Sequence, residues 1–396
     1  MRFQHLIPFL IFGIFSTLVD GSENEDNKDH STGKKKEKVF SLFSVVQFRN
    51  TVCAIGSGAS RIRNGTCLKQ SECADRGGSG RANCASGFGV CCFFAIQTCG
   101  SVATENCTYI QNPGFPTPYR VLTPCSYTIQ RCSNNVCRLR LDFEMFTTFE
   151  PAGTIETDDG GVCNPRWDQF SVQNLNTGNP MNSIIPVICG ENTGQHIYID
   201  IGNQDGDSAS LNFAFRQEQR DRVWDIKVTQ IPCNTIDDPP AGCLQYLKGT
   251  SGRFTTFNFN ILSSQHLGNQ NYRICIRREL GHCCIQYIPC ANEANSFSIG
   301  GTNLKSAVDT DCSTDYINIP NASNTCGGAN LSQRFCSKMG ILGFFNNANA
   351  NTEVCSCTAP FTFGVITDIT KNPNDDQMIQ RGVCMDYRQI PCGGGN

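Results

Sequence analysis

Residues 224–233 read WDIKVTQIPC, and residues 383–392 read VCMDYRQIPC. Both stretches end in Gln-Ile-Pro-Cys after a run in which apolar and polar residues alternate. Weaker repeats lie upstream. Cys163 and Asp168 precede Gln-Phe much as Cys312 and Asp315 precede Tyr, and VIC at 187–189 is matched by RFC at 334–336. Internal repetition at this scale predicts two related units, covering about residues 99–233 and 234–392.

Alternation of apolar and polar residues recurs throughout both units. A period of two is typical of half-buried antiparallel strands, and no amphipathic helix of comparable clarity is present. Each unit is close to the ~100 residues of a β-sandwich, with room for insertions. The sequence therefore predicts an all-β protein with two antiparallel β-sandwiches. The predicted strands centre on residues 139–143, 197–201, 211–215, 257–261 and 361–365.

The composition restricts where the chain functions. Its 396 residues include 26 cysteines, a number unlikely in the reducing cytosol. The net charge of -3 argues against a broad nucleic-acid-binding surface, which needs a basic excess. A disulfide-rich extracellular protein fits both observations.

The N-terminal 38 residues are predicted to stay outside the folded part. Residues 1–21 carry Arg2, an apolar stretch from Leu6 to Val19 and a possible cleavage point after Gly21, which is typical of a signal peptide. The apolar run is too short for a membrane anchor, which needs ~20 residues. Residues 22–38 contain no aliphatic or aromatic residue and form a charged, disordered linker. The mature chain is expected to be secreted and soluble.

Residues 39–95 form a separate disulfide-rich module. Its six cysteines are at positions 53, 67, 73, 84, 91 and 92, and six cysteines allow fifteen pairings. A zinc site is the alternative, but the secretory context and the lack of a CxxC pair disfavour it. The spacing and the terminal cysteine pair resemble the clip domain of arthropod serine proteases and of their inactive homologues. That resemblance implies the bonds Cys53–Cys91, Cys67–Cys84 and Cys73–Cys92.

Residues 96–233 resemble a CUB domain. The stretch CGSVATENCTYIQNPGFPTPY at 99–119 matches the opening Cys-Gly and the N-P-G-F-P turn of that family. The resemblance implies the bonds Cys99–Cys125 and Cys163–Cys189. Residues 234–396 lack the N-P-G-F-P turn and are a second, divergent CUB-like domain, in which Cys312–Cys336 is the corresponding later bond. The whole arrangement resembles secreted arthropod CUB proteins with a clip-like N-terminal module.

The remaining cysteines are expected to pair within their own modules, because each module holds an even number. All 26 cysteines should therefore be bonded, and no bond should leave residues 39–95. Cys132 and Cys137 could close a hairpin, which would leave Cys107 to bond Cys233.

The CUB resemblance also implies calcium ligands. Many CUB domains bind Ca²⁺ through loop carboxylates, and hard cations prefer several oxygen ligands. The alternative is that these carboxylates are solvated loop residues and turn caps. In the first domain Glu150 and Asp168 match the implied positions, whereas the third position does not match and leaves Asn203 or Asp205 as a displaced substitute. In the second domain the matching residues are Asp315 and Asp368, since Glu293 is too distant in sequence.

The sequence predicts no enzyme. It contains neither a Gly-Asp-Ser-Gly-Gly stretch nor a His-Glu-x-x-His motif. His196, His266 and His282 lie beyond the linker, and none has a nucleophile in a recognisable setting. Surface or packing roles are the better interpretation of all three.

A secreted, non-catalytic protein that binds an extracellular protein is the function that these features favour. The alternative is a non-catalytic cofactor or regulator of a clip-domain serine protease cascade. Neither reading predicts nucleic acid or a membrane span as a partner. Glycosylation is expected at the sequons of Asn64, Asn106, Asn321 and Asn330.

Overall fold

The computed structural model describes residues 47–56, 62–151, 161–164, 166–175, 185–202, 204–216, 219–260, 265–300, 307–328, 332–337, 353–369 and 380–393. The chain divides into the compact units Met1–Gln47 and Phe48–Asn396. Every element below lies in the second unit. The predicted signal peptide and charged linker lie outside the described residues. Within the described ranges, no helix has the length and hydropathy of a membrane span.

The N-terminal module is a small disulfide-bonded sheet with one short helix. The bonds Cys53–Cys91, Cys67–Cys84 and Cys73–Cys92 are formed, and none of the six cysteines bonds a later residue. The last strand, β4, pairs with β2 and β3 along its first part and with β6 of the next domain along its end. The module therefore shares a sheet with the domain that follows it. Its elements are β1 (Val52–Ile55), β2 (Arg63–Leu68), α1 (Gln70–Asp75), β3 (Ser79–Cys84), a 3-10 turn (Ala85–Gly87) and β4 (Gly89–Ile96).

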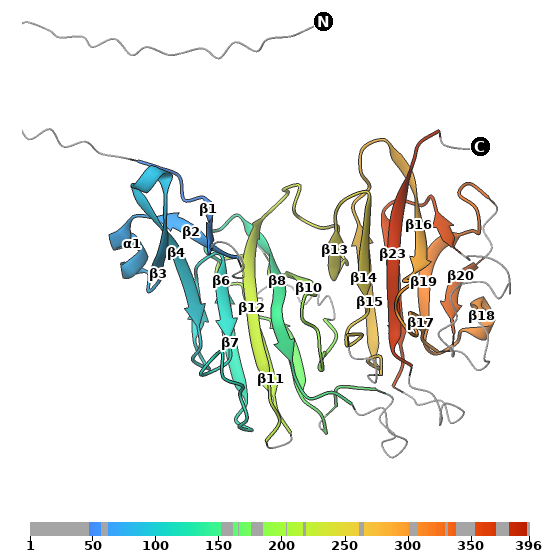
Figure 1. The fold of residues 1–396 in the computed structure, drawn as a ribbon, viewed down its shortest axis with the longest axis horizontal. Helices are drawn as coiled ribbons and strands as arrows, with labels where there is room; N and C mark the ends of the chain where they lie inside the picture. The colour runs from blue at the N-terminus through green and yellow to red at the C-terminus, as the bar shows by residue number, and fades with distance from the viewer. Residues whose placement is uncertain are drawn as a thin grey trace, which may run out of the picture. The chain divides into compact units, whose positions relative to one another are not determined.

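A first β-sandwich follows (Figure 1). Strands β6-β12-β8-β10 form one sheet and β5-β7-β11-β9 form the other. Aromatic rings join the two sheets: Trp224 of β12 stacks on Phe213 of β11 with ring centroids 4.3 Å apart. The strands are β5 (Val102–Ala103), β6 (Thr108–Gln111), β7 (Cys125–Gln130), β8 (Val136–Thr147), β9 (Gln169–Asn174), β10 (His196–Asp200), β11 (Ser208–Ala214) and β12 (Val223–Pro232).

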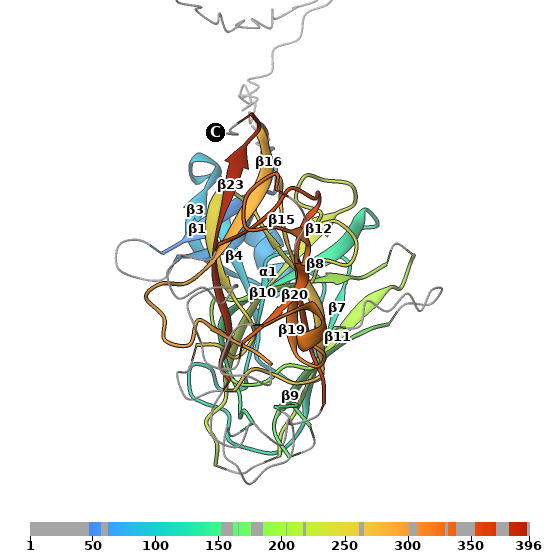
Figure 2. The same ribbon diagram turned by 90° about the vertical axis from the view of Figure 1, so that its right-hand side faces the viewer.

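The second β-sandwich has the same kind of core. Phe363 of β22 packs across the two sheets on Phe254 of β14 and Tyr287 of β16. The ring centroids are 4.9 Å apart for Phe254 and 5.4 Å apart for Tyr287. One sheet runs β13-β15-β22-β19-β20-β18 and the other β14-β23-β16-β21, with β17 beside β23. Figure 2 shows β23 next to its partner β16. Its strands are β13 (Gln245–Leu247), β14 (Ser251–Thr255), β15 (Gln270–Ile276), β16 (His282–Pro289), β17 (Phe297–Ser298), β18 (Ala307–Val308), β19 (Tyr316–Ala322), β20 (Ser332–Cys336), β21 (Val354–Ser356), β22 (Phe361–Thr367) and β23 (Gly382–Pro391). A 3-10 turn covers Asp309–Asp311. The prediction of an all-β protein is confirmed.

The repeated Gln-Ile-Pro-Cys sequence ends the last strand of each sandwich. Gln230, at the end of β12, is buried, and its side-chain amide donates to the Gln130 carbonyl and accepts the N–H of Cys132. Gln389 of β23 is equally buried and accepts the N–H of Glu279. Each glutamine thus satisfies buried backbone groups of a neighbouring loop, which are costly to leave unpaired.

The cysteine of the same sequence bonds the adjacent strand. Pro232 pairs with Val136 at the start of β8, so Cys233 lies beside Cys137 and bonds it. Cys392 bonds Cys283 in the same way. The predicted Cys132–Cys137 hairpin bond is therefore wrong, because strand register brings Cys137 to Cys233.

The prediction that all 26 cysteines pair is also wrong in this structure. Cys107 is a buried free thiol and Cys132 an exposed one, since their expected partners bond each other. Other bonds lie within the sandwiches, including the three that the CUB resemblance implied. These are Cys99–Cys125, Cys163–Cys189, Cys243–Cys275, Cys284–Cys357, Cys290–Cys384, Cys312–Cys336 and Cys326–Cys355.

One predicted strand is a turn that joins the two sandwiches. Residues 257–260 do not form the expected strand. Strand β14 ends at Thr255, and Asn258 lies in the turn that follows, with a φ of 63°. In this conformation Asn258 Oδ1 accepts the N–H of Glu191, and Asn258 N–H donates to Asn192 Oδ1, both from the first sandwich. Gly190 is required there, because a Cβ atom would lie 2.0 Å from Asn258 Oδ1. The turn conformation serves the contact between domains.

A buried histidine forms another part of that contact. His196 begins β10, is 9% exposed, and its Nε2 accepts the backbone N–H of Tyr246 at 3.1 Å. Beside it, Tyr198 N–H donates to the Leu244 carbonyl at 2.7 Å. Burial, aided by the charge of Arg140, lowers the pKa of His196 to about 4, against the weaker opposing effect of Asp142. The neutral imidazole is therefore the form that the interface requires.

Acidification should weaken the fold through this residue. A neutral His196 contributes its full stabilisation above the unfolded pKa of about 6.5, and the contribution falls as the pH drops toward about 4. At pH 5 we expect a loss of about 2 kcal/mol in the free energy of unfolding relative to pH 7.5. Urea unfolding of the wild type and of His196→Gln, which keeps an acceptor but does not titrate, measures it. Equal pH dependence of the two proteins would refute the assignment.

Candidate functional site

Asp168, the central calcium ligand expected from the sequence, forms a buried ion pair with Arg222. Its carboxylate lies at the start of β9, is fully buried, and accepts two hydrogen bonds from Arg222, Nε at 2.6 Å and Nη2 at 3.0 Å. Its oxygens also accept the backbone N–H of Phe149 at 2.8 Å and of Arg216 at 3.3 Å. Four donors surround the carboxylate, which is the usual requirement for a buried charge.

Arg222 is as buried as its partner. Its side chain has no exposed surface, and its guanidinium carbon lies 4.9 Å from the centre of the Phe215 ring. The fork of donors on a guanidinium matches the two oxygens of a carboxylate. The positive charge that a metal would bring to Asp168 is thus supplied by the chain.

The other first-domain residues expected as ligands lie in different environments. Asp205 is exposed, and its carboxylate lies 3.8 Å from Arg131. Glu150 follows β8 and is half-buried. Asn203, the alternative to Asp205 as the third ligand, lies outside the described residues.

The second domain brings its two expected ligands side by side. Asp315 precedes β19 and Asp368 follows β22, and the N–H of Asp368 donates to Asp315 Oδ1 at 2.8 Å. Asp315 therefore orders the loop after β22, which is the turn-cap role that the sequence left open. Glu293 pairs instead with Arg381 at 3.1 Å.

The calcium site stays a prediction, because the described residues show no set of three converging carboxylates. Among them, side-chain ligand atoms of three acidic, histidine or cysteine residues converge only at Cys284, Cys355 and Cys357. Those sulfur atoms are in disulfides, so they offer no thiolate to a metal. Calcium needs 6–8 oxygen ligands, and neither loop set assembles even three carboxylates.

Sequence reasoning missed the two buried arginines, although a signal was present. Arg222 lies 11 positions before Cys233, and Arg381 lies 11 positions before Cys392. Arg381 is also buried, and its Nε donates to the Phe259 carbonyl at 2.7 Å. The repeat that ends in Gln-Ile-Pro-Cys therefore begins with an inward-facing arginine.

The sequons differ in their environment. Asn106 is locked, because its Oδ1 accepts the N–H groups of Cys107 and Gln230 at 2.8 Å each. Asn64 is half-buried in β2, whereas Asn321 is exposed at the end of β19. Asn330 lies outside the described residues. Of the three described asparagines, Asn321 is the most open to a glycan.

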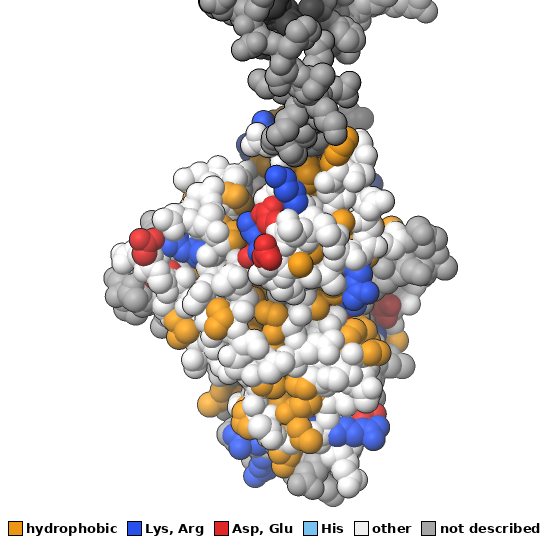
Figure 3. All heavy atoms as spheres, turned by 90° about the vertical axis from the view of Figure 1, so that its left-hand side faces the viewer, with side chains coloured by type: hydrophobic (Ala, Val, Ile, Leu, Met, Phe, Trp, Pro, Cys, Tyr) orange, Lys and Arg blue, Asp and Glu red, His pale blue; other side chains and the backbone are white. Residues whose placement is uncertain are grey.

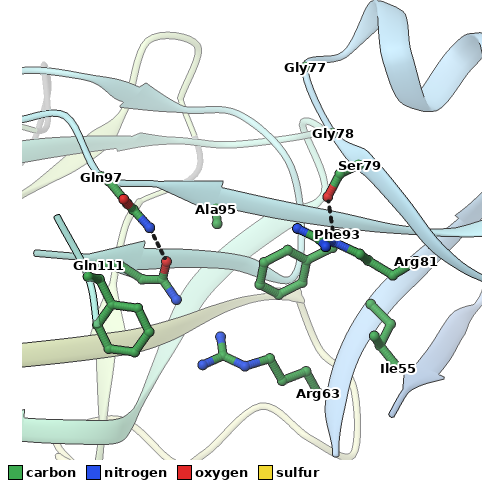
Figure 4. A pocket seen from close by; sticks show the side chains of 11 residues that line it. Ile55, Arg63, Gly77, Gly78, Ser79, Arg81, Phe93, Ala95, Gln97 and Gln111 are labelled. Carbon is green, nitrogen blue, oxygen red and sulfur yellow. Dashed lines mark hydrogen bonds between the residues drawn. The ribbon is translucent and has the colours of Figure 1, made fainter. Parts of the chain in front are cut away.

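A groove of about 510 Å³ lies where the N-terminal module meets the first sandwich (Figure 4). We call it the junction groove. Two arginines reach it, and their guanidinium carbons lie 5.5 Å (Arg63) and 6.0 Å (Arg81) from the centre of the Phe93 ring. The residues that line it come from β1 to β4, β6 and the turn after β6: Ile55, Arg63, Gly77, Gly78, Ser79, Arg81, Phe93, Ala95, Gln97, Gln111 and Phe115.

The two arginines of the junction groove differ in charge balance. Arg63 pairs with Asp225, which has no exposed surface and also accepts an N–H of Gln111 at 3.0 Å. Arg81 is exposed, and its Nε donates to Ser79 Oγ at 3.0 Å. No carboxylate pairs with Arg81 in the described part of the chain. The groove therefore presents one uncompensated cation.

Comparison with known proteins assigns the second sandwich to a family. The animal CUB domain model matches residues 240–390. The chain is a disulfide-rich CUB-domain protein. The match falls on the domain that the sequence indicated as the more divergent. No curated protein sequence matches the chain.

Three solved structures are similar to this chain at low sequence identity. The CUB1-EGF-CUB2 domains of rat MASP-1 are 13% identical, with 74% of this chain and 99% of that chain covered and a TM-score of 0.23. The same domains of human MASP-1/3 are 14% identical, with 71% of this chain and 98% of that chain covered and a TM-score of 0.23. The full extracellular region of zebrafish Gpr126/Adgrg6 is 11% identical, with 76% of this chain and 34% of that chain covered and a TM-score of 0.25. TM-scores this low support no inference about function.

The ion pair between Asp168 and Arg222 should dominate the stability of this part of the CUB-domain protein. Asp168→Asn keeps the shape of the side chain but leaves Arg222 buried and uncompensated. We expect the free energy of unfolding to fall by about 3–5 kcal/mol. Asp221→Asn, which breaks the exposed pair with Arg120, is the matched control and should leave stability unchanged. Urea denaturation of both variants tests this, and wild-type stability of Asp168→Asn would contradict it.

Proposed function

We propose that this chain is a secreted, non-catalytic CUB-domain protein that binds an extracellular protein partner. Its disulfides are spread through all three folded parts, and such bonds persist in oxidising, extracellular conditions. CUB domains usually mediate protein interactions outside cells, and the family match to residues 240–390 supports that class of function here.

The junction groove is the observation that carries the proposal. It is open, it combines aromatic faces with an uncompensated arginine, and its walls are held by disulfides and a shared sheet. Concave, preformed sites with a few polar groups are the usual binding sites of proteins. A rigid site also loses less conformational entropy when a partner binds.

The histidines support a non-catalytic role. His196 Nε2 accepts a backbone N–H, and Nδ1 of His266 and of His282 lies 3.3 and 3.1 Å from a backbone carbonyl oxygen. These contacts are structural, and they hold the rings against the chain. A general base needs a ring nitrogen within reach of the proton that it removes.

The alternative function, a cofactor or regulator of a clip-domain serine protease cascade, is favoured by one observation. The N-terminal module pairs Cys53–Cys91, Cys67–Cys84 and Cys73–Cys92, as a clip-like module would. In that case the module would contact a protease.

Affinity capture separates the two functions. The full secreted chain is immobilised and exposed to extracellular fluid, and retained proteins are identified by mass spectrometry and rebound in purified form. We expect one extracellular protein, such as a receptor or matrix component, to rebind the native chain and not the reduced, alkylated chain. Specific recovery of clip proteases would favour the cofactor role. Hydrolysis of a captured protein that is lost in His196→Gln would contradict a non-catalytic function.

A further inference from the structure

We propose that the junction groove binds an acidic peptide segment of the partner protein, in which a carboxylate lies beside an aromatic or aliphatic side chain. This inference rests on the proposed function and assigns it a site and a ligand chemistry. It is supported by the charge, the aromatic surfaces and the rigidity of the groove.

Charge selects an anionic ligand. The described residues that line the groove include two arginines and no carboxylate. Asp225 already neutralises Arg63 from beneath the groove, whereas Arg81 has Ser79 Oγ as its polar contact. A guanidinium binds a carboxylate through two parallel N–H donors, which makes Arg81 suited to an Asp or Glu side chain.

The aromatic residues select a ligand that also carries apolar groups. Phe93 and Phe115 are half-buried and line the same groove as Arg81 (Figure 4). Part of each ring faces the space that a ligand would fill. An apolar side chain next to the bound carboxylate would cover this surface and gain from its burial.

Side-chain amides provide contacts suited to a peptide backbone. Gln97 is exposed on the groove wall, and its Nε2 donates to Gln111 Oε1 at 3.0 Å. Gln111 in turn donates to Asp225 at 3.0 Å. This chain of hydrogen bonds orients the Gln97 amide, so its oxygen can accept an N–H of a bound peptide.

The groove is preformed. Gly78 packs on the Cys73–Cys92 bond, where an added Cβ would lie 2.3 Å from Cys92 Sγ. The floor strand β4 continues from the module into parallel pairing with β6 of the first CUB domain. The backbone that carries Arg81 and Phe93 is therefore fixed before any ligand arrives.

A sulfated polysaccharide fits the groove less well than a peptide. Polyanions require several uncompensated cations in a row, as phosphate chains do. The described lining of the groove supplies one, and the basic side chains on the face shown in Figure 3 lie in separate small groups. The single cation beside aromatic rings matches one carboxylate in an apolar context.

Fluorescence anisotropy with the full secreted chain tests the proposal. The probe is a labelled hexapeptide that alternates glutamate with phenylalanine, and the comparison peptide carries glutamine in place of glutamate. We expect the acidic peptide to bind at least about tenfold more tightly than the glutamine peptide. Arg81→Gln should remove that difference. Arg278→Gln changes an exposed arginine of the second CUB domain and is the matched control, which should bind as the wild type does.

A second variant tests the location by obstruction. Ala95 is exposed and lines the groove, so Ala95→Trp should fill it and lower the affinity for the acidic peptide about tenfold without lowering the melting temperature. Three results would overturn the proposal: no binding of the acidic peptide, equal binding of both peptides, or wild-type affinity in Arg81→Gln. Tighter binding of a heparin-derived oligosaccharide at the same groove would overturn it as well.

The outcomes distinguish this proposal from the proposed function. If Arg81→Gln still retains the captured partner, the protein-binding function stands and the groove assignment fails. If the acidic peptide binds through Arg81 but no extracellular protein is retained, the groove assignment stands and the proposed function fails.

Discussion

In the first sandwich, the end that carries the β8–β9 and β11–β12 loops depends on one buried charge. Arg222, which directly precedes β12, donates two hydrogen bonds to Asp168 at the start of β9. The same carboxylate accepts the N–H groups of Phe149 after β8 and Arg216 after β11. Two connections, β8–β9 and β11–β12, are thereby tied to a single ion pair. Since the cation belongs to the chain, we expect the order of these loops to be independent of the metal concentration around the protein.

Both sandwiches fix their last strand at its two ends. An inward-facing arginine precedes the strand, and a buried glutamine and a bonded cysteine end it. The arginine partners differ, because Arg222 pairs with Asp168 whereas Arg381 pairs with Glu293 and backbone carbonyls. A strand held in this way provides a rigid frame for the surfaces built on it. The junction groove is therefore expected to bind its ligand without rearrangement.

The sequence predicted features that local patterns determine. Alternating residues and the Gln-Ile-Pro-Cys repeat indicated two all-β units, because strand faces and strand ends are local properties. Features that depend on register or long-range packing were not predictable. Cys137 bonds Cys233 because β8 and β12 are paired there, and Asp168 meets a guanidinium 54 residues later in the chain. The groove arises only when β4 pairs with β6, a contact with no local signal.

Amide hydrogen exchange at Phe149 and Arg216 shows whether Arg222 orders the β8–β9 and β11–β12 loops in place of a metal. Both N–H groups donate to Asp168 and report on the integrity of that site. The full chain is measured in millimolar Ca²⁺ and again in excess chelator. The account predicts equally slow exchange of both amides under the two conditions. Exchange that becomes faster when calcium is removed would contradict it.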